Sequence, residues 1–262
     1  MLQFAANLTM MYTELPFLER FSAAAQDGFA WVEYLFPYQW PASKLSMLLR
    51  TNHLQQVLLN APPGDWQAGD RGVACIPGRE AEFRRSIDEA LRYAEALECP
   101  RIHVMAGVLP SNADRAEARA TYVSNLAFAA EVARGAGREV LVEPINPYDI
   151  PGYFLNRQDE AHTIVAEIEK ENLGVQMDLY HCRRVEGDVA EQVRRYVVEG
   201  TGRVRHLQIA GFPGRHEPDT GDLDYAPLLD MVERSQYRGW IGCEYIPSGR
   251  TSDGLGWFRA RR

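Results

Sequence analysis

Polar residues end four successive apolar segments in the second half of the chain: Glu143, Asp178, Gln208 and Glu244. Each segment has the composition of a strand that is buried on both faces. A carboxylate at the end of a buried strand costs free energy unless another group compensates its charge. The spacings of 35, 30 and 36 residues suggest that the four side chains meet at one end of a parallel sheet, where a divalent cation is the simplest compensation.

This set of residues predicts an oxygen-rich metal site and a proton-transfer reaction. Three carboxylates and one amide oxygen suit Mg²⁺ or Mn²⁺ better than zinc. A cation that polarises a carbonyl and its neighbouring hydroxyl lowers the cost of removing a carbon-bound proton. Glu143 and Glu244 are expected to move protons on either side of the substrate, as in aldose–ketose isomerisation. The alternative, a series of unrelated rim residues paired with arginines, is weakened by its repetition at four strand ends.

Two further polar residues lie close to predicted strand ends. His181 follows Asp178 by three residues, and it could orient the aspartate, bind substrate, ligate the cation or simply begin a helix. Glu33 ends an earlier apolar segment, and we interpret it as a structural residue of the rim.

The elements that must position these residues follow a regular alternation. Segments with helical periodicity separate eight short strand-like segments, which is the pattern of a (β/α)8 TIM barrel. We predict one barrel domain over residues 1–262, with its active site at the carboxyl-terminal face of the strands. The predicted strands are residues 3–8, 30–36, 56–60, 101–107, 139–145, 173–178, 204–210 and 239–245.

Composition narrows the functional class. The 262 residues carry a formal net charge of −8, which disfavours binding to nucleic acid or to an anionic membrane. No apolar stretch is long enough to span a bilayer, and no signal peptide is recognisable at the amino terminus. The four cysteines have no CxxC spacing and are expected to be reduced thiols, so we predict a cytoplasmic enzyme. The sequence is compatible with a homo-oligomer.

The chain resembles the hydroxypyruvate isomerase family and the related 2-oxo-tetronate isomerases, within the xylose isomerase-like barrels. The resemblance covers nearly the whole chain and is carried, in order, by Phe4–Leu8, Val32–Tyr38, Pro63–Trp66, Ile76–Glu80, Val142–Asn146, Gln176–His181, His206–Ala210, Arg215–Pro218 and Gly239–Tyr245. It implies that Glu143 and Glu244 are the paired acid–base residues and that Asp178 and Gln208 complete the metal site. In related ketose 3-epimerases a histidine takes the place of Gln208, which weakens an epimerase interpretation.

The resemblance also implies a small hydroxy- or oxo-acid substrate. His181 and Arg215 match positions that contact substrate in the relatives. A substrate carboxylate requires a cation, and Arg71, Arg79 and Arg215 are the candidates. The leading prediction is isomerisation of hydroxypyruvate to 2-hydroxy-3-oxopropanoate (tartronate semialdehyde).

Other reactions stay open at this point. Residues 10–14 and 103–107 look like the 2-oxo-tetronate branch, whereas residues 143–152 look like the hydroxypyruvate branch. The alternative is therefore isomerisation of a 2-oxo-tetronate, and a ketose 3-epimerase or a non-catalytic sugar-acid binding protein is more distant. An apurinic-site endonuclease with several zinc ions is disfavoured because the chain has six histidines and an acidic balance.

Overall fold

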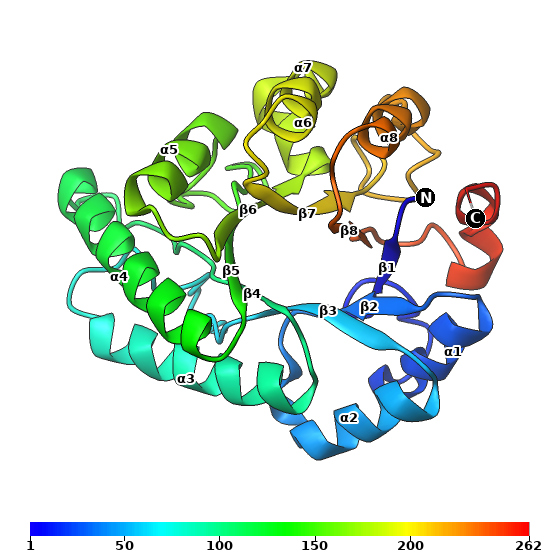
Figure 1. The fold of residues 1–262 in the computed structure, drawn as a ribbon, viewed down its shortest axis with the longest axis horizontal. Helices are drawn as coiled ribbons and strands as arrows, with labels where there is room; N and C mark the ends of the chain where they lie inside the picture. Colours follow the sequence, from blue (N-terminus) through cyan, green and yellow to red (C-terminus); the bar gives the residue numbers. More distant parts are fainter. Residues whose placement is uncertain (262) are drawn as a thin grey trace.

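The computed structural model describes residues 1–261 and shows a closed barrel of eight parallel strands in sequence order (Figure 1). The strands are β1 (Phe4–Asn7), β2 (Trp31–Glu33), β3 (Gln55–Asn60), β4 (Arg101–His103), β5 (Glu139–Val142), β6 (Leu173–Asp178), β7 (Val204–Ile209) and β8 (Trp240–Cys243). Strand β8 pairs with β1 and closes the barrel. The prediction of a TIM barrel is confirmed.

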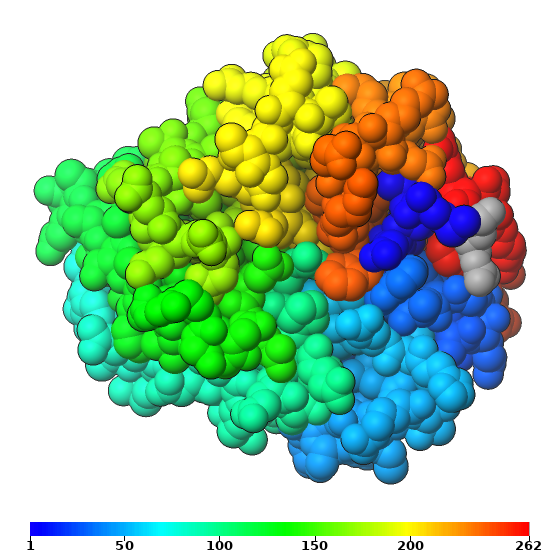
Figure 2. Space-filling view, in the orientation of Figure 1, coloured from blue at the N-terminus to red at the C-terminus, as the bar shows by residue number. Residues whose placement is uncertain are grey.

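Helices occupy the segments between strands and surround the barrel (Figure 1). They are α1 (Arg20–Gln26), α2 (Ala42–Thr51), α3 (Glu80–Ala96), α4 (Arg115–Gly135), α5 (Gln158–Ile168), α6 (Leu179–Glu186), α7 (Val189–Val193), α8 (Tyr225–Arg234) and α9 (Gly256–Arg259). Short turns of other helical types are η1 (Phe17–Glu19), η2 (Pro37–Gln39), η3 (Arg194–Val198) and η4 (Thr251–Gly254). Side chains fill the middle of the face seen in Figure 2.

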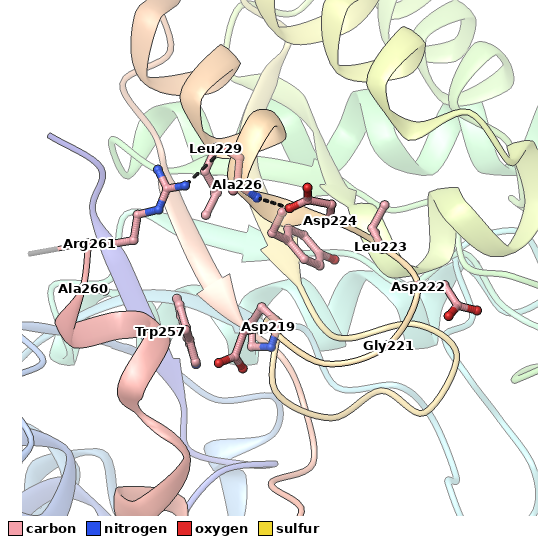
Figure 3. Close-up of a pocket in the computed structure, with 12 residues that line it drawn as sticks. Asp219, Gly221, Asp222, Leu223, Asp224, Ala226, Leu229, Trp257, Ala260 and Arg261 are labelled. Carbon is pink, nitrogen blue, oxygen red and sulfur yellow. Dashed lines mark hydrogen bonds between the residues drawn. The ribbon is translucent and has the colours of Figure 1, made fainter.

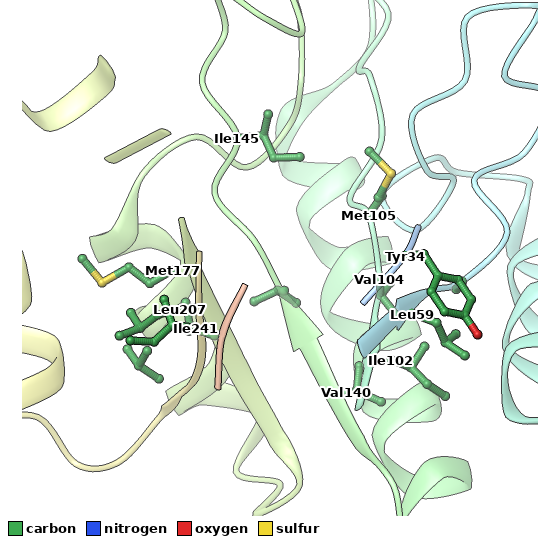
Figure 4. Close-up of a cluster of buried hydrophobic side chains, with 14 of the residues drawn as sticks. Tyr34, Leu59, Ile102, Val104, Met105, Val140, Ile145, Met177, Leu207 and Ile241 are labelled. Atoms are coloured by element: carbon green, nitrogen blue, oxygen red, sulfur yellow. The ribbon is translucent and has the colours of Figure 1, made fainter. Parts of the chain in front are cut away.

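The hydrophobic core lies between the strands and the helices. Figure 4 shows Met177, Leu207 and Ile241 gathered on one side of the barrel, and Ile102 and Val140 on another. These side chains are at most 1% exposed, so each strand contributes apolar surface that its covering helix removes from water. No helix among the described residues has the length and apolarity needed to cross a membrane. The four cysteines are buried and unpaired.

Several strands are shorter at their carboxyl ends than predicted. The segments 30–36, 101–107 and 139–145 leave the hydrogen-bonded ladder after Glu33, His103 and Val142. Apolar residues continue beyond these points because they wall a cavity at the mouth of the barrel, as Phe36 and Ile145 do. Apolar composition therefore marked the buried segment correctly but not the end of the ladder.

Candidate active site at the carboxyl ends of the strands

A compact group of four polar side chains lies at the carboxyl ends of β5, β6 and β8. Glu143 follows β5, Asp178 ends β6, His181 lies in the first half of α6, and Glu244 follows β8. All four are at most 6% exposed. One potential ligand atom of each lies within 4.8 Å of the others. The barrel thus brings the three predicted carboxylates together with His181.

The positively charged side chain of Arg215 contacts this group. Its Nη2 donates to Glu244 Oε2 at 2.7 Å and to Asp178 Oδ2 at 3.4 Å. The residue has a φ of 55°, an uncommon conformation for arginine that is consistent with a constrained functional loop. Its carbonyl accepts a hydrogen bond from Ile246 N at 2.8 Å, which ties the loop after β7 to the segment after β8.

Burial and mutual repulsion disfavour the ionised carboxylates. Burial raises the pKa of Glu143 well above its usual range, and the neighbouring Glu244 and Asp178 raise it further. Burial also raises the pKa of Glu244 to about 8, although Arg215 opposes this shift. The pKa of Asp178 is raised by burial as well, against the opposing effects of Arg215 and the Tyr180 backbone N–H. One arginine is therefore insufficient compensation for three carboxylates.

The donor set fits a hard divalent cation. Three carboxylates and one guanidinium sum to a formal charge of −2 when all are ionised, and Glu143 Oε1 is a buried oxygen with no hydrogen-bond partner among the described residues. Mg²⁺ and Mn²⁺ prefer such oxygen ligands, and binding would relieve the repulsion that raises these pKa values.

The hydrogen bonds of His181 indicate which ring nitrogen carries the proton. Asn146 Oδ1 accepts from the backbone N–H groups of Tyr148 and Asp149, which leaves Asn146 Nδ2 to donate to His181 Nδ1 at 2.6 Å. Burial and the nearby Arg215 lower the pKa of His181, so the ring is neutral and carries its hydrogen on Nε2. The contact of Arg215 Nη2 with Nε2 is longer, at 3.4 Å. His181 therefore presents a donor to the site rather than a free lone pair.

Gln208 lies in a layer of buried polar side chains inside the barrel. Its Nε2 donates to Glu33 Oε1 at 2.8 Å, and its Oε1 accepts from Gln176 Nε2 at 2.7 Å. An amide oxygen has two lone pairs, so this bond leaves Gln208 one for a cation. Gln176 also connects the layer to the site, because its hydrogen bond to Glu143 is one of the effects that lower the pKa of that carboxyl.

Glu33 holds this inner layer together, in agreement with its interpretation as a structural residue. Its carboxylate accepts from Asn7 Nδ2 at 3.0 Å and contacts His206 Nε2 at 2.6 Å, in addition to Gln208. The absence of a side chain at Gly242 is required here, since a Cβ would lie 2.4 Å from both Glu33 oxygens.

A cavity of about 350 Å³ opens over the four-residue group. Such a volume falls at the small end of the roughly 300–1,000 Å³ range of small-molecule sites. Its lining residues come from the carboxyl ends of all eight strands and the segments that follow them: Met10, Leu35, Phe36, Asn60, Trp66, Arg71, His103, Met105, Glu143, Ile145, Asp149, Ile150, His181, Arg215 and Glu244. Asp178 and Gln208 are not in the lining, because both are completely buried beneath it.

The two arginines of the long loop after β3 have different surroundings. Arg71 lines the cavity, stacks on Trp66 with 3.7 Å between its Cζ and the ring centroid, and has no carboxylate partner among the described residues. Arg79 lies outside the lining and is paired with both Asp70 and Glu82. The structure therefore brings Arg71 and Arg215 to the cavity but leaves Arg79 in a structural ion-pair network.

Gly72 fixes the loop beside Arg71. Its φ is 100°, and a Cβ at this position would lie 2.2 Å from the carbonyl oxygen of Met105. Its N–H donates to Pro63 O at 2.9 Å, and Cys75 N donates to Ala106 O at 2.8 Å. The loop is consequently packed against the end of β4, which places Arg71 at the cavity.

Asn60 and His103 are cavity residues that the sequence analysis did not single out. They are register partners at the carboxyl ends of β3 and β4, and they are 3% and 1% exposed. Both end predicted strands or lie within them, so the pattern that selected Glu143 and Asp178 could also have selected Asn60. His103 lay inside a segment predicted to continue to residue 107, which concealed its place at a strand end.

A second hollow lies on the outer surface, between the loop before α8 and the carboxyl-terminal α9 (Figure 3). Its aspartates are partly engaged, since Asp224 caps α8 by accepting from Ala226 N. Arg261 is paired with Asp230. None of the strand-end residues of the candidate site lines this hollow.

Comparison with known proteins assigns the family. Residues 21–261 match the family described as "Xylose isomerase-like TIM barrel". This chain belongs to that family. A protein of Cupriavidus necator named 2-oxo-tetronate isomerase is 56% identical over 98% of this chain and 97% of its own. The hydroxypyruvate isomerase of Escherichia coli is 42% identical, over 98% of both chains. These relatives confirm the prediction that this family member is an isomerase.

Solved structures agree with the fold. A Brucella melitensis protein described as AP endonuclease, family 2 superposes with a TM-score of 0.96, at 46% identity, over 100% of both chains. The D-allulose 3-epimerase of Methylomonas sp. superposes with a TM-score of 0.75 at 21% identity, covering 99% of this chain and 89% of its own. The second likeness concerns the barrel architecture alone.

Proposed function

We propose that this isomerase moves a carbonyl group between adjacent carbons of a short, unphosphorylated 2-oxo acid with the assistance of Mg²⁺ or Mn²⁺. The observation that carries the proposal is the buried group of three carboxylates at the floor of a small cavity that also contains two arginines. Hydroxypyruvate and a 2-oxo-tetronate, the substrates named for the relatives, both satisfy this chemistry.

Glu143, Asp178, Glu244 and the amide oxygen of Gln208 are the residues proposed to hold the cation. When bound, the cation would supply electrostatic stabilisation of the negative charge that develops on the substrate oxygens. His181 is better suited to donate a hydrogen bond from Nε2 to a substrate oxygen, because its other nitrogen accepts from Asn146.

The proton transfers are assigned to the two glutamates. One carboxylate takes the proton from C3 of the substrate, and the carboxylic acid of the other gives a proton to C2. The proton of the C3 hydroxyl is transferred to the oxygen on C2, so the 2-oxo acid becomes the 3-oxo isomer with no net oxidation. The raised pKa values of Glu143 and Glu244 favour a state in which one of the pair is protonated near neutral pH.

Arg71 is proposed to bind the substrate carboxylate. Its guanidinium lines the cavity with no carboxylate partner in residues 1–261, whereas Arg215 already contacts Glu244 and Asp178. An arginine can bind a carboxylate through two hydrogen bonds. We expect Arg71→Met to raise KM by about tenfold or more with a smaller effect on kcat, since each hydrogen bond to a charged group contributes about 1.5–3 kcal/mol. Arg50→Met is the matched control, because Arg50 is exposed and distant from the cavity lining.

The deciding experiment is turnover of hydroxypyruvate and of a 2-oxo-tetronate after chelation, followed by addition of Mg²⁺ or Mn²⁺. Activity that disappears on chelation and returns with the metal supports the proposal. Absence of turnover of both substrates in the presence of metal overturns it. Activity that is unaffected by chelation would support the isomerase activity but exclude the proposed metal site.

A further inference from the structure

One wall of the cavity carries polar side chains that have no hydrogen-bond partner among the described residues. The amide of Asn60 makes no hydrogen bond to any described residue, and neither ring nitrogen of His103 has a hydrogen-bond partner there. Both side chains are more than nine-tenths buried, and both line the cavity. Since a buried polar group without a partner costs free energy, this arrangement indicates a wall that binds a polar group of the substrate.

From their position, Asn60 and His103 would contact one end of the substrate. Asn60 and His103 end adjacent strands β3 and β4, whereas the carboxylate group occupies the ends of β5, β6 and β8. The two regions meet where His103 Nε2 lies 3.5 Å from Glu143 Oε2. A substrate whose C2–C3 segment lies beside Glu143 therefore extends one of its ends toward Asn60 and His103.

The chemistry of the wall identifies that end as a hydroxyl group. Asn60 Oδ1 is an acceptor and needs a donor, which neither a carboxylate nor a keto oxygen can provide. In its neutral form the buried ring of His103 offers one donor and one acceptor, and neither nitrogen has a hydrogen-bond partner among the described residues. A hydroxyl group can give and receive one hydrogen bond each, and it brings no charge into the buried wall.

We propose that Asn60 and His103 form a subsite for the terminal hydroxyl group of a four-carbon 2-oxo acid, and that this subsite makes 2-oxo-tetronate the preferred substrate over hydroxypyruvate. This inference rests on the proposed function. A 2-oxo-tetronate carries a hydroxymethyl group beyond the reacting carbons. Hydroxypyruvate ends at the reacting C3 and leaves the subsite unpaired.

The size of the preference follows from the unpaired groups. Adding a carbon to an apolar pocket changes selectivity by only about 10–200-fold, whereas a site built to hydrogen-bond a hydroxyl rejects an analogue without it by as much as about 10⁴-fold. The apolar side chains nearby, such as Met105 and Leu35, contribute the smaller part. The hydroxyl itself must therefore account for most of the discrimination.

The test compares three substrates that differ only at this end: 2-oxo-tetronate, 3-hydroxy-2-oxobutanoate, which has a methyl group in place of hydroxymethyl, and hydroxypyruvate. We expect kcat/KM for the tetronate to exceed that for the methyl analogue by about 100-fold or more. Similar kcat/KM values for the tetronate and the methyl analogue would overturn the subsite while leaving the isomerase intact. Absence of turnover of all three would instead contradict the proposed function.

Variants at the subsite sharpen the assignment. Asn60→Leu, of similar size, should lower kcat/KM for the tetronate by about 10–100-fold more than it lowers that for hydroxypyruvate, mainly through KM. The ratio of the two values is the readout, because a general loss of folded protein lowers both equally. An unchanged ratio would remove Asn60 from the subsite. His103→Gln, which keeps a donor and an acceptor, should retain more of the preference than His103→Leu.

Discussion

Two layers of buried polar side chains lie inside this barrel, and their carboxylates differ in how fully they are hydrogen-bonded. The inner layer is centred on Glu33, whose two oxygens are both engaged by Asn7, His206 and Gln208. The outer layer, at the strand ends, contains Glu143 and Asn60, whose Oε1 and Oδ1 atoms have no hydrogen-bond partner among the described residues. Both carboxylates cost free energy to bury, but of the two only Glu143 keeps an oxygen without a hydrogen-bond partner among the described residues. The hydrogen bonds of the two carboxylates therefore separate the scaffold from the site more clearly than burial does, although His206 Nδ1 in the inner layer also has no partner among the described residues.

The largest expected effect is a loss of turnover when a carboxylate of the outer layer is replaced. Glu143→Gln keeps the shape of the side chain and removes its capacity to carry a proton, so kcat should fall by about 10²–10⁴-fold. Circular dichroism and a melting temperature close to that of the wild type would show that the barrel is retained. A variant with near-normal turnover would contradict the paired-glutamate mechanism.

Asp178→Asn should act on the cation rather than on the proton transfers. Loss of one anionic ligand is expected to weaken Mn²⁺ affinity by at least about tenfold, and excess Mn²⁺ should restore part of the activity. Isothermal titration calorimetry of the chelated protein measures the affinity directly. Equal affinities for the variant and the wild type would exclude Asp178 from the proposed ligands.

A substitution in the inner layer should instead lower the free energy of unfolding. Glu33→Gln replaces an acceptor of several hydrogen bonds, so we expect a loss of about 1–3 kcal/mol in the free energy of unfolding, measured with urea. At saturating metal its kcat should stay within about tenfold of the wild-type value. If Glu33→Gln lost as much activity as Glu143→Gln, the distinction between the two layers would fail.

The smallest expected effect is a change of the free energy of unfolding with pH, caused by Glu244 in the outer layer. Because folding raises the pKa of Glu244 to about 8, its protonated form stabilises the folded state at low pH, and this contribution is lost as the pH rises toward 8. In chelated protein, the unfolding free energy of wild type relative to Glu244→Gln should therefore decrease between about pH 5 and pH 8. Thermal unfolding across this range tests it, and saturating Mg²⁺ should flatten the trend. If the difference in unfolding free energy between wild type and Glu244→Gln increased with pH, folding would lower the pKa of Glu244 instead of raising it.

Much of this organisation could be predicted from the sequence. Strands buried on both faces are apolar throughout, so a polar residue at their end is conspicuous, as Glu143 and Asp178 were. The same signal existed at Asn60, but its significance depends on having no partner, which only the three-dimensional contacts reveal. The choice between Arg71 and Arg79 also depended on tertiary contacts, because both lie in one loop and only Arg79 is paired with carboxylates. The proton position on His181 required the orientation of Asn146.

The inner layer limits the routes by which a cation or a substrate can reach the site. Glu33, His206 and Gln208 are at most 1% exposed, so they close the barrel interior beneath the cavity. A cation and a substrate would then reach the site from the cavity, whose lining includes Trp66 and Arg71. Asp178 lies deeper than any lining residue, so a bound substrate would lie between the cation and the solvent. In the proposed site the cation would therefore enter before the substrate.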